Sequence, residues 1–294
     1  MGIFIGVLEQ GLIYSIMALG VYITYKILDF PDLTTDGSFP CGAAVTAVLL
    51  TKGVDPYLTT LIAFLAGMLI GALTGVIHVK FKVRDLLSGI IMMTALYSVN
   101  LRITGKANVP LFTQKTVFDN AFVNGIFPKS LLPVQTMIIA FIMALIMKLL
   151  LDMYLNTKSG FLLRATGNND TLVTILAKDK GLVKITGLAI ANGLIAMGGS
   201  VMCQQQRFFD ISMGTGTVVI GLASVIMGIN VFKNLTFMKA TTAVVIGAII
   251  YKACVAIAIA MGLSASDMKL ITAVLFLVIL VITIDRKKKV KKNA

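Results

Sequence analysis

Long apolar runs separated by short polar stretches occupy most of the chain. We expect each run to form a helix in a lipid bilayer, because roughly 20 apolar residues span the hydrocarbon core. Continuous runs of this length lack the alternation that transmembrane β-strands show. The pattern predicts an all-α integral membrane protein, a multi-span helical bundle in one domain of residues 1–294. The nine runs lie at about 3–27, 38–52, 57–79, 86–101, 131–152, 183–204, 215–231, 238–261 and 268–284.

The second and third runs differ from a plain apolar helix. The second is short, contains Pro40 and Gly42, and follows a polar stretch at residues 34–39. This pattern predicts a broken or re-entrant helix, which is tolerated only where protein or a water-filled cavity satisfies the backbone. The third run has a glycine at every fourth position, which predicts close approach of another helix unless glycine is merely abundant there. These glycines are Gly67, Gly71 and Gly75.

Composition and charge agree with a membrane protein. Hydrophobic residues make up 57% of the chain and charged residues 13%, which excludes soluble, disordered and fibrous proteins. The net charge of +13 would suggest nucleic acid in a soluble protein, but the basic residues cluster at the ends of apolar runs. With nine spans, the loop after residue 79, the loop at 153–182 and the basic tail at 285–294 fall on one side. That side should be the cytoplasm, with the N-terminus outside.

Residues for catalysis or metal binding are sparse. The single histidine, His78, cannot form a zinc motif, and the cysteines lack paired spacing. Gly105-Lys106 is followed by Ala107, so no phosphate-binding loop is present there. We also expect neither inverted repeats nor charged residues deep within spans, the features that would favour a secondary transporter. The sequence predicts no enzyme and no catalytic, metal or cofactor residues.

The loop at 153–182 contains a second kind of segment. Asn168 to Asp170 can cap a helix, and the following residues form one apolar face. Such a short amphipathic helix could rest on lipid headgroups or fill a groove on another protein. The apolar face consists of Leu172, Val173, Ile175 and Leu176.

The order of motifs in two distant regions resembles that of a known family. The loop carries Gly160, Arg164-Ala165, Gly167, Asn169 and Gly181, and the N-terminal region carries Asp32-Leu-Thr-Thr-Asp-Gly-Ser-Phe. Together they resemble the permeases of bacterial ABC transporters for branched-chain amino acids and simple sugars, over essentially the whole chain. The second motif, with Leu96-Tyr-Ser-Val-Asn-Leu-Arg, looks like a subgroup for amino acids, aromatic ones among them. The departure is Asn169-Asp170-Thr171, where many relatives have a proline.

The resemblance implies a type II importer-like permease in the bacterial cytoplasmic membrane. Such permeases act as dimers, here a homodimer, with two cytoplasmic ATPase subunits that hold ATP and Mg²⁺. An extracytoplasmic binding protein delivers the solute, and the chain itself holds no cofactor and binds no nucleic acid. The helix at about 169–179 would be the coupling helix. The ATPase-coupling residues would be Arg164, Gly167, Asn169, Asp170, Leu172, Val173, Ile175 and Leu176.

Four polar residues are candidates for the translocation path. The positive end of a half-helix favours an anionic group such as a carboxylate. Packing of polar residues between helices is the alternative interpretation of all four. The predicted function is amino-acid import, with permeation of a sugar or nucleoside, export, or secondary transport as alternatives. The candidates are Asp36, Ser38, Asn100 and Arg102.

Overall fold

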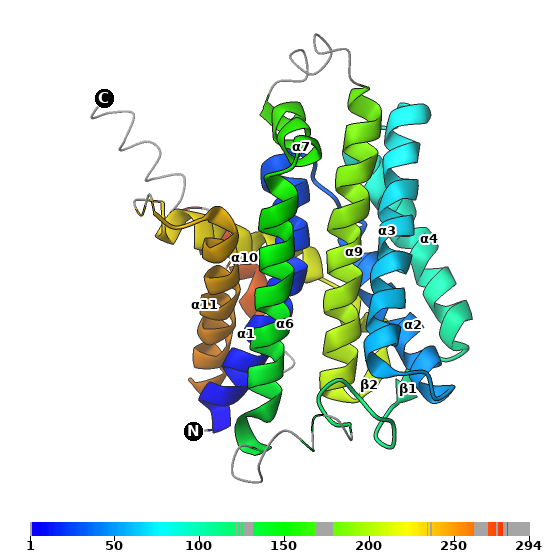
Figure 1. The fold of residues 1–294 in the computed structure, drawn as a ribbon, viewed down its shortest axis with the longest axis vertical. Helices are drawn as coiled ribbons and strands as arrows, with labels where there is room; N and C mark the ends of the chain where they lie inside the picture. The colour runs from blue at the N-terminus through cyan, green and yellow to red at the C-terminus, as the bar shows by residue number, and fades with distance from the viewer. Residues whose placement is uncertain are drawn as a thin grey trace.

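The fold is a bundle of long helices with a small two-stranded antiparallel sheet at one end (Figure 1). A computed structural model describes residues 2–120, 123, 125, 132–168, 179–233, 235, 237–261, 270–274, 276–278 and 281. The elements are α1 (Gly2–Tyr22), a π-helix (Ile23–Ile27), α2 (Thr35–Thr51), α3 (Pro56–Lys80), α4 (Asp85–Thr104), β1 (Asn108–Pro110), α6 (Leu132–Leu155), α7 (Lys158–Asn168), α9 (Lys180–Gln206), β2 (Phe208–Asp210), η3 (Ile211–Gly214), α10 (Thr217–Val231) and α11 (Ala240–Ala260).

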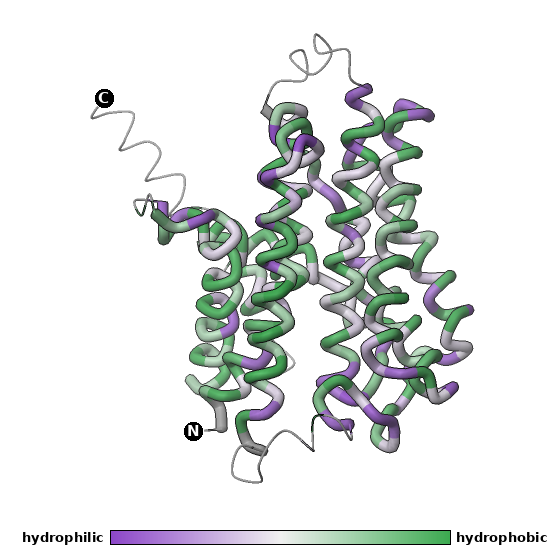
Figure 2. Tube along the Cα trace, viewed as in Figure 1, coloured by the Kyte–Doolittle hydropathy of each residue, from purple (hydrophilic) through white to green (hydrophobic). Residues whose placement is uncertain are grey.

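Seven segments of the described part are long and apolar enough to cross a membrane. This confirms the all-α multi-span fold, although the predicted count of about nine is slightly too high. The predicted second span is α2, which has only 17 residues. The predicted ninth span, 268–284, lies largely outside the described residues. Figure 2 shows apolar residues along the helices and hydrophilic ones concentrated towards the two ends of the bundle.

The helix α9 lies at the centre of the bundle. It packs against α1, α2 and α3, and 78% of its most apolar stretch is buried. Its close approach to α3 depends on the predicted glycine stripe, because a methyl group at Gly71 would overlap the carbonyl oxygen of Leu188. A methyl group at Gly75 would come within 2.8 Å of the Ile185 Cα atom. The predicted close helix approach along this stripe is confirmed.

The predicted break near the second span lies earlier in the chain than expected. The end of α1 changes into a π-helix, and residues 28–34 form no regular helix before α2 begins at Thr35. Residues 35–39, which the sequence analysis placed in the break, form the first turn of α2. The reason is that the polar side chains there find partners on neighbouring helices. The non-helical segment therefore precedes the polar motif.

A second unit of the chain repeats this arrangement in the opposite direction. In both units the first helix is followed by a residue with a positive φ. This residue is Asp29 after the π-helix, with a φ of 51°, and Arg207 after α9, with a φ of 58°. Three residues later, Asp32 and Asp210 each accept a hydrogen bond from the backbone N–H two residues on, at 2.9 and 2.7 Å. A short helix follows in both units, α2 in one and α10 in the other. Figure 1 shows α1 and α9 running in opposite directions, so the two units are inverted.

This inverted relationship contradicts the expectation that the chain contains no inverted repeats. The matching segments are Asp29-Phe-Pro-Asp-Leu-Thr and Arg207-Phe-Phe-Asp-Ile-Ser. Their likeness is limited to six residues separated by most of the chain, so only the shared backbone geometry makes it evident. An inverted repeat is thus compatible with this fold and does not by itself indicate a secondary transporter.

Candidate translocation and coupling sites

The first turn of α2 meets the first turn of α10 inside the bundle. The carboxylate of Asp36 accepts hydrogen bonds from the Thr217 hydroxyl at 2.9 Å, the Val218 N–H at 2.8 Å and the Gly216 N–H at 3.1 Å. Asp36 therefore caps a neighbouring helix, where a negative charge is favourable. Its position agrees with a role beside a path between half-helices, which stays a prediction. The positive end of α10 is already neutralised by this carboxylate.

Ser38 belongs to a buried polar network between α2 and α9. Its hydroxyl donates to the Asn192 Oδ1 atom at 2.6 Å, and the Asn192 amide donates to Asp32 Oδ2 at 2.8 Å. All three side chains are buried. The sequence analysis did not identify Asp32 or Asn192 as site residues, because 160 positions separate them and no local pattern links them. The network ties the non-helical segment to the central helix.

The other two predicted path residues lie on α4 and differ in environment. Asn100 is buried and its amide donates to the Gly37 carbonyl oxygen at 3.2 Å, so it adjoins Asp36 and Ser38. Arg102, near the end of the same helix, is exposed. The structure therefore brings three of the four residues together around the first turn of α2 and leaves Arg102 apart.

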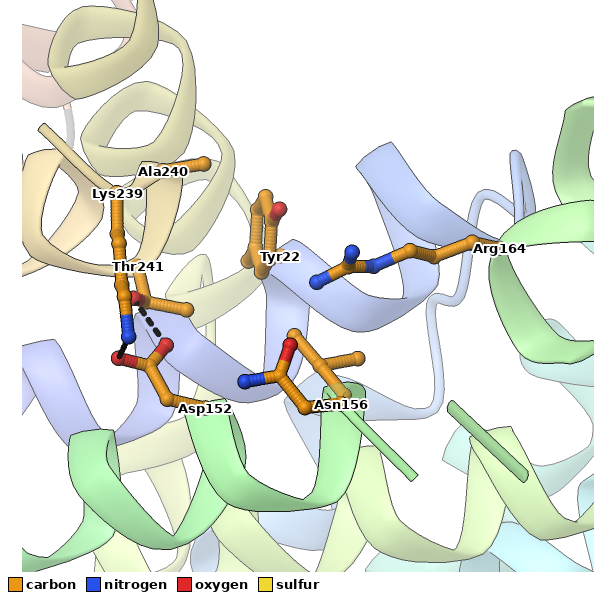
Figure 3. A pocket seen from close by; sticks show the side chains of 8 residues that line it. Tyr22, Asp152, Asn156, Arg164, Lys239, Ala240 and Thr241 are labelled. Atoms are coloured by element: carbon orange, nitrogen blue, oxygen red, sulfur yellow. Dashed lines mark hydrogen bonds and ion pairs between the residues drawn. The ribbon is translucent and has the colours of Figure 1, made fainter. Parts of the chain in front are cut away.

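The end of the bundle that contains α7 has a polar pocket of about 280 Å³ (Figure 3). Asp152 of α6 forms ion pairs with Lys148 at 2.9 Å and Lys239 at 3.4 Å, and accepts a hydrogen bond from the Thr241 hydroxyl at 2.6 Å. In Figure 3, the Arg164 side chain extends from α7 towards this cluster. Arg164 therefore lines a pocket between helices as well as belonging to the predicted coupling loop.

Gly167 fixes α7 against the end of the first span. A methyl group at this glycine would overlap the carbonyl oxygen of Ile27, the last residue of the π-helix. A displacement of α7 would therefore act directly on the segment that leads into α2. The remaining predicted coupling residues lie outside the described residues, and their helix stays a prediction. They are Asn169, Asp170, Leu172, Val173, Ile175 and Leu176.

Charged residues do occur within spans, contrary to the sequence-based expectation. Lys252 lies in the middle of α11 and is only 7% exposed, whereas Asp152, 8% exposed, lies near the end of α6. Lys252 is the single charged residue of α11, so that run still appears uniformly apolar in sequence. Intramembrane charges of this kind often mark functional positions.

Comparison with known proteins identifies the family of this chain. Residues 3–284 match the family described as the permease component of branched-chain amino acid transport systems. The chain belongs to this permease family. It is therefore a membrane-embedded transport subunit, as the motifs in the loop and the N-terminal region predicted.

Individual relatives of this permease carry different names. It is 46% identical to the tyrosine transport system permease protein of Clostridioides difficile, over 94% of this chain and 90% of the relative. It is 27% identical to a probable branched-chain amino acid transport permease of Methanocaldococcus jannaschii, over 73% of this chain and 70% of the relative. It is 24% identical to the ribose import permease of Escherichia coli K12, over 76% of this chain and 67% of the relative. No solved structure matches the permease.

Proposed function

We propose that this permease is the membrane subunit of an ATP-driven importer for an aromatic amino acid, with tyrosine as the first candidate. The observation that carries the proposal is the 46% identity to a tyrosine transport system permease along nearly the full length of both chains. The identity to the ribose permease is only 24%, over 76% of this chain. Amino-acid import is therefore favoured over sugar import.

Two cytoplasmic ATPase subunits are the proposed partners at the end that contains α7. They would hold ATP and Mg²⁺ and contact the segment after Asn168, while a second copy of the permease completes the transporter. An extracytoplasmic binding protein would dock at the opposite end, near the two-stranded sheet in which Val109 pairs with Phe209. The ion pair between Arg207 and Asp119, at 2.6 Å, supports a defined shape for that surface.

The proposed orientation places α7 in the cytoplasm and the N-terminus outside. Basic residues gather at the α7 end, which agrees with the positive-inside rule. The start of α1 lies at the opposite end in Figure 1. The basic residues are Lys80, Lys82, Arg84, Lys158, Arg164, Lys180, Lys184, Lys233 and Lys239.

Coupling would pass from α7 to the junction of the half-helices. When ATP closes the ATPase pair, the coupling segment moves and α7 moves with it. Gly167 transmits that motion to Ile27, and the non-helical segment 28–34 passes it to α2. Asp36 joins α2 to α10, so both short helices shift together. Solute passage is then a change in population between outward- and inward-open states.

A screen of ATPase stimulation tests the proposed cargo. The complex is reconstituted with its ATPase and binding protein, and ATP hydrolysis is measured with tyrosine, phenylalanine, leucine, ribose and a nucleoside. Stimulation by the aromatic amino acids above the others is expected. Stimulation by ribose but not by tyrosine would replace the proposal with sugar import, which the similarity to the ribose permease supports.

A further inference from the structure

Lys252 is a buried lysine that has no anionic partner among the described residues. In the described part of the chain, no carboxylate lies within 4.0 Å of its ammonium nitrogen. The nitrogen lies 3.8 Å from the centre of the Tyr14 ring and 3.5 Å from the Gln10 Oε1 atom. Both partners are neutral. The contact with the aromatic face and the amide oxygen therefore stabilises the ammonium but does not neutralise it.

An uncompensated charge at this depth is unfavourable for the fold alone. Removing an ammonium from water costs free energy that a neutral amide recovers only in part. A methionine or leucine at position 252 would fill the same place between α1 and α11 without that cost. The cost is understandable if an anionic group reaches Lys252 during the working cycle.

A cavity of about 340 Å³ provides access to Lys252. It lies between α1 and α11 and extends from the lysine towards the end of the bundle opposite α7. Its walls are apolar and built from small and branched side chains, while Gln10 and Lys252 supply the polar groups. Cavities of this size and composition are typical of small-molecule sites. The apolar walls include Gly6, Val7, Val255, Ala256 and Ile259.

The aromatic contact of Lys252 links this cavity to the junction of the half-helices. The Tyr14 ring stacks on Phe39 with centroids 5.8 Å apart and an angle of 13° between the planes. Phe39 lies in the first turn of α2, three residues after Asp36. A ligand at Lys252 would therefore lie close to the stacked pair of Tyr14 and Phe39. This pair packs beside the place where Asp36 joins α2 to α10.

We propose that Lys252 and Gln10 form a binding site for the carboxylate and amino groups of an amino-acid cargo. The ammonium of Lys252 binds the carboxylate, and the Gln10 amide oxygen accepts a hydrogen bond from the cargo's amino group. The cargo's side chain lies along the apolar wall between α1 and α11. This inference rests on the proposed import of amino acids, and it adds a defined cargo site within the permease itself.

Equilibrium binding to the permease–ATPase complex without its binding protein tests the site. Labelled tyrosine is bound to the wild-type complex in lipid nanodiscs and displaced with tyramine, which lacks the carboxylate. We expect saturable tyrosine binding and displacement by tyramine at least about tenfold weaker than by unlabelled tyrosine, since a charge-assisted contact is lost. This comparison uses only the wild-type protein, so it does not depend on whether any variant folds.

Two variants then assign the effect to Lys252. Lys252→Met should weaken tyrosine binding by at least about tenfold, whereas Lys252→Arg, which keeps the charge, should stay within a few-fold of wild type. Absence of tyrosine binding by wild type, equal displacement by tyramine, or wild-type binding by Lys252→Met would each overturn the inference. Transport is measured on the same preparation with the binding protein added. Tyrosine transport together with unaltered binding by Lys252→Met rejects the site alone, whereas ribose transport without tyrosine transport rejects the proposed cargo.

Discussion

Gly167 of α7 lies directly against the carbonyl oxygen of Ile27, with no room between them for a side chain. Ile27 ends the π-helix, and the eight residues from Ile27 to Thr34 lead to the first residue of α2. The predicted coupling loop and the non-helical segment of the bundle are therefore in physical contact. Because close-packed elements move as units, this contact is a direct route for motion between them.

Replacing Gly167 by alanine should impair coupling more than it impairs assembly. The added methyl group overlaps backbone, which cannot yield as a flexible side chain can, so α7 must move away from Ile27. We expect uptake to fall several-fold while the permease still inserts and purifies with its ATPase. Gly125→Ala is a suitable control, because a methyl group there would meet no atom of the described residues within 4 Å. Equal uptake by Gly167→Ala and Gly125→Ala would show that coupling does not depend on the contact between Gly167 and Ile27.

Asp36 should be required for its charge and its acceptor atoms. In Asp36→Ala, the Gly216 and Val218 N–H groups lose their acceptor, at a cost of about 1 kcal/mol typical of a lost helix cap. We expect reduced uptake with assembly intact. Asp36→Asn keeps one acceptor oxygen and should retain more uptake. The stability of the two variants is measured by thermal unfolding in detergent, and their transport by uptake. If Asp36→Ala takes up as much solute as wild type, Asp36 does not belong to the translocation path.

The predicted coupling helix can be tested with a double substitution. Leu172 and Leu176 lie outside the described residues, so this prediction comes from the sequence pattern alone. Replacing both by aspartate would bury charge in the ATPase groove, which costs several kcal/mol without compensating partners. The ATPase should then co-purify poorly and uptake should collapse, while the permease inserts normally. Normal co-purification would mean that the helix only rests on headgroups, and the coupling role would move to the basic loop at Lys80–Arg84.

The contact between α3 and α9 should depend on small side chains. Gly71→Val places branched carbons against the backbone of Leu188, so the two helices must separate. Overpacking of this kind usually costs about 1–3 kcal/mol, and more where backbone is displaced. We expect a lower midpoint of thermal unfolding than in Gly125→Ala, measured by fluorescence-detected size exclusion. An unchanged midpoint would show that this interface is not tightly packed.

The orientation of the chain has a direct test at its ends. Single cysteines are introduced near residues 2 and 290 of a version in which Cys41, Cys203 and Cys254 are replaced. The residue near the N-terminus should react with an impermeant reagent from outside the cell, and the residue in the basic tail only after permeabilisation. Reaction of both from the same side would contradict the proposed arrangement of spans.

The sequence predicted features that depend on local composition. The long helices followed from apolar length, and the close approach of another helix at Gly71 followed from the spacing of small residues, although the sequence did not identify that helix as α9. The α2 break was placed a few residues too late, because Asp36 and Ser38 look unsuited to a helix until their partners on α10 and α9 are known. Hydropathy treats such a segment as a full span, which explains why the 17-residue α2 was predicted as one.

The candidate site was only partly predictable for the same physical reason. Asp36, Ser38 and Asn100 stand out as polar residues in apolar surroundings, and the structure brings them together. Asn192 and Asp32 complete the network, but their pairing is set by the packing of distant helices. Lys252 gave no local signal, since one lysine in a strongly apolar run does not change the prediction of a span.

Uptake of labelled tyrosine into proteoliposomes tests the central claim most directly. Vesicles contain the permease and its ATPase, with ATP enclosed and the binding protein outside. Accumulation of tyrosine that requires both ATP and the binding protein, and that excess phenylalanine reduces more than excess ribose, is the predicted result. Accumulation of ribose instead of tyrosine, or tyrosine movement that needs no ATP, would contradict it.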